Sequence, residues 1–112
     1  MMQPAWTHQE DAEVCVYPDR RSADLIGTPT VPTTSGFNVG LAWYTATEFG
    51  APQVHDDQEA IYVISGEGEL RVGDQVVALR PGVAVYVPPG TPHGGRTLEA
   101  EPVVVVYAHG AV

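Results

Sequence analysis

The sequence predicts an all-β domain, either a sandwich or a closed barrel. Proline or glycine interrupts almost every stretch that is long enough for three helical turns, since the chain has 10 prolines and 12 glycines. The intervening segments are short, rich in β-branched and aromatic residues, and separated by turns at regular intervals. A chain of 112 residues has room for one compact domain.

The first part of the chain contains two weak segments and one clear strand. Residues 14–17 are a brief β-prone run that ends at Pro18. Residues 22–36 contain two prolines and are typical of an extended loop or an edge strand. Apolar side chains alternate along residues 37–44, which predicts a strand with one strongly apolar face. That face consists of Phe37, Val39, Leu41 and Trp43.

The second part of the chain contains the remaining predicted strands. These lie at residues 61–64, 70–72, 75–79, 83–87 and 103–108. Gly73 and Asp74 form a two-residue connection, and the glycine can supply the positive φ of a tight hairpin. The last segment is apolar at every position, which predicts a strand buried on both faces.

Composition excludes several classes of function. The chain has fourteen acidic residues, five arginines and no lysine, which gives a net charge of −9. It therefore has no basic surface that would bind nucleic acid. The absence of lysine excludes Schiff-base chemistry and a P-loop. Cys15 is the only cysteine, so it has no partner for an internal disulfide. The chain shows no signal peptide and no apolar run of membrane-spanning length, so we expect a cytoplasmic protein without a membrane partner.

Two segments combine metal-binding side chains at close spacing, at residues 53–59 and 88–93. If the first segment is extended, Gln53, His55 and Glu59 face the same way. A carboxylate on the inner face of a barrel is costly to bury unless a cation compensates it. Because the chain has no lysine, a bound metal is the natural partner, and His93 is the obvious further nitrogen ligand.

The first segment resembles the first motif of the cupin superfamily. The family pattern runs from two histidines to a glutamate and then a glycine, and this chain has Gln53, His55, Glu59 and Gly66 at the matching spacing. The departures are Gln53, which stands where the family has its first histidine, and Gly50, which lies three positions later than the glycine that opens the family motif.

The second segment resembles the second cupin motif. Gly82, Pro88, Gly90 and His93 match it in order and spacing, and Thr97 stands where the family has asparagine. The resemblance implies a small cupin barrel, the double-stranded β-helix or jelly-roll fold. We expect residues 36–112 to form it, with residues 1–35 as an arm of the same unit that covers a sheet edge or exchanges with a neighbouring copy.

The resemblance also implies a metal site. Transferred residue by residue, the ligands are His55, Glu59 and His93, with Gln53 as a further ligand through its amide oxygen. Such nitrogen and oxygen donors suit Fe(II), Mn, Ni, Co or Zn, so the ion is left open. The other interpretation is that Gln53 marks a cupin that has lost its metal.

The expected activity is that of a metal-dependent enzyme on a small organic substrate, either dioxygenase-like or a lyase, cyclase or isomerase. Glu59 could leave the metal and act as a base, because burial would raise its pKa. The alternative is a non-catalytic cupin that binds or senses a small molecule at a degenerate site. Strand parity suggests a pocket lined by Phe37, Trp43, Ile61 and Val85.

Two further expectations concern the ends of the chain and its assembly. His8 and His109 lie near the termini and are expected to be solvated. Cupins of this size are commonly dimers, and the Pro-interrupted N-terminal arm is compatible with that, so we expect a homodimer.

Overall fold

The computed structural model describes residues 2–112, which fold into two antiparallel β-sheets. The larger sheet has the strand order β1-β2-β3-β9-β4-β7 and the smaller one the order β6-β5-β8. The strands are β1 (Cys15–Val16), β2 (Arg20–Ile26), β3 (Asn38–Tyr44), β4 (Gln58–Ser65), β5 (Gly68–Val72), β6 (Gln75–Leu79), β7 (Ala84–Val87), β8 (His93–Thr97) and β9 (Val103–Gly110). A short 3₁₀ turn, Gln9–Asp11, precedes β1. The predicted all-β jelly-roll architecture is confirmed.

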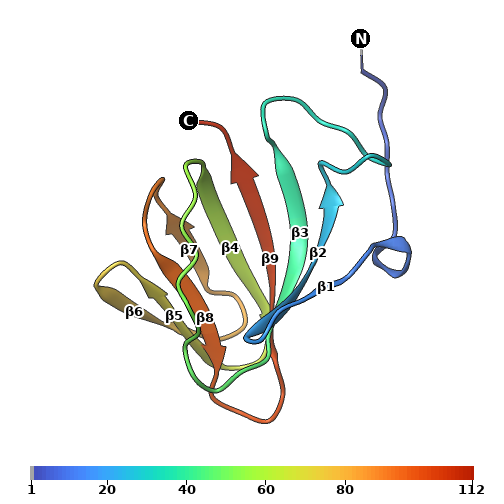
Figure 1. Ribbon diagram of the computed structural model, residues 1–112. Helices are drawn as coiled ribbons and strands as arrows, with labels where there is room; N and C mark the ends of the chain where they lie inside the picture. The colour runs from blue at the N-terminus through green and yellow to red at the C-terminus, as the bar shows by residue number, and fades with distance from the viewer. Residues whose placement is uncertain (1) are drawn as a thin grey trace.

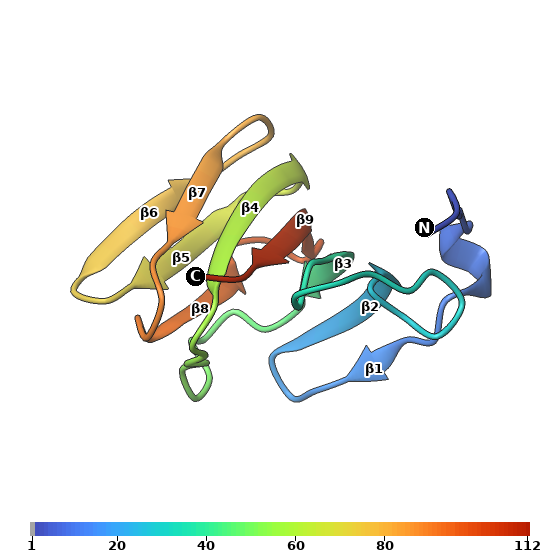
Figure 2. The same ribbon diagram turned by 90° about the horizontal axis from the view of Figure 1, so that it is seen from above.

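The two sheets face each other over part of their width. Figures 1 and 2 show the smaller sheet beside β7 and β4, whereas β1 and β2 extend away from it at the opposite edge. The core lies between the sheets and is formed by inward side chains of both. It comprises Ala42, Tyr44, Ile61, Val63, Leu70, Leu79, Val87, Val103 and Val105.

The predicted hairpin is present with the expected register. β5 and β6 pair from Val72 with Gln75 at the turn to Gly68 with Leu79 at the far end. Gly73 has φ of 57°, in the left-handed region that favours glycine, so the residue type fits the turn.

Strand β3 presents the opposite face to the core from the one predicted. Its inward residues are Asn38, Gly40, Ala42 and Tyr44, and Tyr44 is 5% exposed in the core. Leu41 and Trp43 therefore lie on the outer side of the larger sheet. The alternation of side chains did not identify the inner face, because both faces of this strand carry apolar side chains.

The first 35 residues contribute two strands to the larger sheet. β2 pairs with β3 from Arg20 opposite Tyr44 to Ile26 opposite Val39, and β1 pairs with β2. The proposed boundary at residue 35 and an exchange of the arm between copies stay predictions. Among residues 2–112, no helix is long and apolar enough to cross a membrane.

Candidate metal centre

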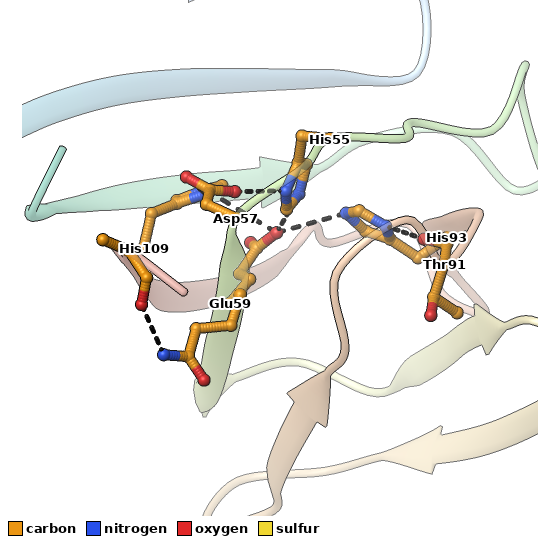
Figure 3. Close-up of polar contacts among 8 residues, drawn as sticks. His55, Asp57, Glu59, Thr91, His93 and His109 are labelled. Carbon is orange, nitrogen blue, oxygen red and sulfur yellow. Dashed lines mark hydrogen bonds and ion pairs between the residues drawn. The ribbon is translucent and has the colours of Figure 1, made fainter.

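Three histidines from different parts of the chain surround the carboxylate of Glu59 (Figure 3). Glu59 lies on β4, directly opposite His109 of β9, so the sheet register places the two side chains side by side. His55 belongs to the loop before β4. His93 begins β8, where paired backbone hydrogen bonds with Gln53 hold it against that same loop.

The histidines converge on one carboxylate oxygen. The distances from Glu59 Oε1 to the Nε2 atoms are 2.9 Å for His55, 3.1 Å for His93 and 3.6 Å for His109. Ligand atoms of His55, Glu59 and His109 all lie within 4.8 Å of one another. Both Glu59 and His93 are buried, with 8% and 3% of their surface exposed.

The other nitrogen of each ring faces an oxygen acceptor. His93 Nδ1 is 2.9 Å from the carbonyl oxygen of Thr91. The carboxylate of Asp57 accepts a hydrogen bond from His109 Nδ1 at 3.1 Å and also lies 2.5 Å from His55 Nδ1, which makes no hydrogen bond. A carbonyl oxygen and a carboxylate can only accept hydrogen bonds, so the Nδ1 atoms of His93 and His109 carry the proton, whereas His55 donates from Nε2 to Glu59. This pattern fixes the tautomer of His93 and His109 and leaves their Nε2 atoms facing Glu59.

That tautomer leaves an electrostatic problem at the centre of the cluster. Neutral rings of His93 and His109 would point an Nε2 lone pair at a carboxylate oxygen, which is repulsive, so a positive charge is needed between them. Protonation of these two rings would supply it only by placing two cations within 3.6 Å of the same oxygen of Glu59. A single divalent cation solves the same problem with one charge centre. The donor set, three imidazoles and a carboxylate, fits a transition metal.

The pKa values of this cluster follow from its contacts. Burial opposes ionisation of Glu59, but the hydrogen bond from His93 and the charges of His109 and His93 outweigh it, so its pKa is lowered. Burial likewise opposes the charged form of His93, but its contacts with Glu59 and Thr91 prevail and raise its pKa. Glu59 was expected to have a raised pKa suited to a base. That expectation is wrong because three imidazoles surround the carboxylate.

We expect metal affinity to fall as the pH is lowered from about 8 to about 6. Binding requires neutral rings, and the raised pKa of His93 extends proton competition above its ordinary value of 6.5. The apparent affinity should drop about tenfold per pH unit for each proton displaced. Competition with a chelating dye for Zn(II) at three pH values measures it. An affinity that does not change over this range would contradict the assignment of these rings as ligands.

The structure brings together three of the predicted ligands and places the fourth nearby. His55, Glu59 and His93 form the cluster, and Gln53 lines the adjoining cavity with Glu59 and His93. The predicted pocket residues do not line it. Phe37 is 49% exposed, Trp43 is on the outer face of the larger sheet, and Ile61 and Val85 belong to the core or pack against it.

Sequence reasoning missed two members of the site, His109 and Asp57. The expectation that His109 is solvated is wrong, because its side chain is 17% exposed and contacts both Asp57 and Glu59. A signal was available in strand parity. Val103 and Val105 point into the core, and continuing the alternation to position 109 directs its imidazole to the same side.

A cavity of about 270 Å³ adjoins the cluster. Its walls come from β2, β3, β4, β8, β9 and the segments before β2 and β4, and most of its lining is polar. The lining residues are Tyr17, Arg20, Ser22, Asp24, Asn38, Ala42, Tyr44, Gln53, Glu59, His93, Tyr107 and His109. Its volume is at the small end for ligand pockets, so it suits a small molecule.

The cupin-domain family model matches residues 45–109, more than half of the chain. The chain belongs to the cupin family. This cupin matches no curated protein. Among solved structures, it resembles an RmlC-like cupin from Shewanella frigidimarina, with 16% identity over 98% of this chain and 93% of the other and a TM-score of 0.76.

Two further solved structures have the same fold. The polyketide cyclase RemF from Streptomyces resistomycificus is 22% identical, with coverage of 97% of this cupin and 79% of that chain and a TM-score of 0.76. A mutant of the oxalate decarboxylase OxdC from Bacillus subtilis is 15% identical with a TM-score of 0.82. There the match covers 99% of this cupin but 30% of the decarboxylase chain. At these identities the similarity establishes the fold.

Proposed function

We propose that this cupin is a metal-dependent enzyme that acts on a small organic substrate. The observation that carries the proposal is the convergence of three histidine Nε2 atoms on Glu59, with the rings of His93 and His109 held by acceptors at Nδ1. Metal ligands in proteins are typically oriented by such outer contacts. Two of the similar structures are described as a cyclase and a decarboxylase, which supports an enzymatic role.

The ion would be held by His55, Glu59, His93 and His109, with Gln53 beside them. This set accommodates Fe(II), Mn, Ni, Co or Zn. When bound, such an ion acts as a Lewis acid on a substrate oxygen. A cyclase, lyase or isomerase reaction, or a dioxygenase-like one, would be compatible with that chemistry.

The chain itself contributes a polar cavity beside the metal cluster. Tyr44 and Tyr107 form part of its wall, and the Tyr107 hydroxyl donates a hydrogen bond to Asp24. Burial and the neighbouring carboxylate raise the pKa of Tyr107, so its hydroxyl keeps its proton. These groups would orient a polar substrate next to the metal cluster.

Elemental analysis by mass spectrometry tests the metal site directly. Protein purified without chelator should contain close to one equivalent of a transition metal. Asp57→Asn keeps the shape of the side chain but weakens the acceptor of His109 Nδ1, so metal affinity should fall by about 10- to 100-fold. His8→Ala, which alters an exposed histidine outside the cluster, is the matched control.

The metal site would be contradicted if the purified protein contained negligible metal and took up none of Fe(II), Mn(II), Ni(II) or Zn(II). Imidazolium groups would then balance Glu59, and the proposal of a metal enzyme would fail. The cavity would in that case be that of a non-catalytic cupin that binds a small molecule.

We further propose that this cupin assembles as a homodimer through the outer face of the larger sheet. On β4, β7 and β9 this face carries Ala60, Tyr62, Ile64, Ala84, Tyr86, Val104, Val106 and Ala108, all of them uncharged. Tyr62 is 51% and Tyr86 57% exposed. Three strands, β9, β4 and β7, at about 4.8 Å spacing and about seven residues at 3.3 Å give a face of roughly 330 Å² in projection.

A second copy fits this face because its side chains are apolar and uncharged, as at the core of homodimer interfaces. In a chain of net charge −9, none of the fourteen acidic side chains lies on this face, so two copies can meet there without opposing their charges.

Light scattering on a sizing column should give the mass of a dimer at micromolar concentration. Val106→Asp places a charge at the centre of the face and should shift the population to monomer, because burying an unpaired carboxylate is costly. Val76→Asp, at an exposed valine of β6 in the smaller sheet, should leave the dimer unchanged. A wild-type monomer would overturn the proposed assembly.

A further inference from the structure

The loop before β4, residues 45–57, follows the edge of β8 in the smaller sheet (Figure 1). Backbone hydrogen bonds hold it at both ends of that strand. Thr97 donates to the carbonyl oxygen of Ala46 at 2.9 Å. At the other end, Gln53 and His93 exchange two bonds of 2.8 and 3.0 Å. Between these points, the loop makes no backbone hydrogen bond to β8 among the residues that the structure describes.

Phe49, in the middle of this loop, lies against two arginines of the smaller sheet. The guanidinium carbon is 4.3 Å from the centre of the ring for Arg71 of β5 and 4.8 Å for Arg96 of β8. Both arginines project from the outer face, since the alternate residues Leu70 and Gly95 face the core. A guanidinium within about 6 Å of an aromatic ring is attracted to the face of that ring. Phe49 is half-buried, which limits the access of water to these contacts.

Arg96 joins this contact to the backbone of the loop. Its Nη1 donates a 3.3 Å hydrogen bond to the carbonyl oxygen of Thr47. Its Nε donates to Glu69 of β5 at 3.0 Å, and its Nη2 donates to the same carboxylate. Because Glu69 holds the guanidinium in one orientation, the arginine presents a fixed surface to Phe49. Phe49 and Arg96 therefore fasten the middle of the loop to the outer face of the smaller sheet.

The loop determines how His55 meets His93. Their rings lie edge to face with the centroids 4.9 Å apart, and both Nε2 atoms are directed at Glu59. His93 belongs to β8, so a shift of the loop relative to β8 changes the separation of the two rings. The carbonyl oxygen of His55 also accepts a 2.8 Å bond from Gly90. That bond supports the end of the loop near β4, whereas Phe49 supports its middle.

We propose that Phe49 is a positioning residue, which holds the loop so that His55 and His93 can bind one metal ion together. This inference rests on the proposed function, since it concerns the geometry of the same metal site. A site whose ligands are already in place binds its ion more tightly, because they do not have to be ordered on binding. Loss of the Phe49 ring leaves every ligand present but frees the loop, so the metal affinity should fall.

Amide hydrogen exchange of metal-free protein tests the attachment of the loop. In Phe49→Ala, the amides of Gln53 and His93 should exchange about tenfold faster than in wild-type protein, because the loop separates from β8 more often. The matched control is Arg21→Gln, which removes an arginine contact with Trp43 on the larger sheet. That contact stays intact when the loop opens, so the control should leave the exchange of both amides unchanged.

Titration of metal-free protein with Co(II) tests the position of His55. Phe49→Ala should bind Co(II) about tenfold more weakly and alter its visible absorption spectrum, which depends on the geometry of the ligands. Phe49→Tyr keeps the face of the ring and should restore the wild-type affinity and spectrum. Phe49→Leu keeps the apolar bulk without that face, so it should not restore them.

The two measurements separate this inference from the proposed function. Unchanged amide exchange in Phe49→Ala would overturn the attachment of the loop through Phe49. Faster exchange with an unchanged Co(II) affinity and spectrum would overturn the positioning of His55. If wild-type protein takes up no Co(II), the proposed function fails, whereas amide exchange still decides whether Phe49 holds the loop against β8.

Discussion

His93→Ala is expected to lower the metal content of the purified protein at least a hundredfold. His93 is 3% exposed, its Nδ1 proton is directed to Thr91, and its Nε2 is 3.1 Å from the central oxygen of Glu59. Loss of a single outer contact weakens metal binding by about 10- to 100-fold, and loss of a ligand itself removes more. Elemental analysis gives the stoichiometry, and titration of metal-free protein gives the affinity.

The control must separate lost ligation from lost folding, because His93 is buried. Circular dichroism and thermal melting of the metal-free variant should match those of metal-free wild-type protein within a few degrees. His93→Gln offers a second variant that keeps a polar side chain in the same space. If the folded variants keep one equivalent of metal, His93 is not a ligand, and the site reduces to the group of His55, Glu59 and His109.

The sequence predicted best those features in which local chemistry and tertiary structure agree. The hairpin of β5 and β6 depends on a glycine turn between two apolar runs, and both signals are local. Strand β8 was missed because its residues, His93–Thr97, include two glycines and few β-formers. It is a strand because it pairs with β5 along its whole length. Tertiary pairing, which a single sequence does not display, overrides weak local propensity there.

The difference between local pattern and tertiary pairing also explains which residues of the site the sequence identified. His55 and Glu59 are four residues apart, and His93 follows a Pro/Gly turn, so a local pattern marks all three. His109 reaches Glu59 only because β9 lies beside β4 in one particular register. A shift by one residue would direct its ring to the outer face. Predicting it required the strand order, which local pattern did not supply.

Gly95→Ala is expected to destabilise the protein by about 2–3 kcal/mol, whereas Gly94→Ala next to it should be neutral or slightly stabilising. A Cβ at position 95 would lie 2.4 Å from the ring of Tyr44, a buried side chain that is enclosed by the core. A Cβ at position 94 would meet nothing within 4 Å. Neither glycine has a positive φ, so the difference between the variants reports the contact with Tyr44.

Thermal melting measures both variants, and the Gly95 variant should melt about 10 °C lower. Tyr44 also lines the cavity beside Glu59 and His93, so relief of the clash must move a wall of the site. The double variant Gly95→Ala, Tyr44→Leu tests this cause, because a ring that is absent cannot clash. With leucine at position 44, Gly95→Ala should lower the stability much less than it does in wild-type protein. If Gly95→Ala lowers the free energy of unfolding equally in both backgrounds, Tyr44 does not explain the need for glycine. The backbone of β8 would then be the reason for it.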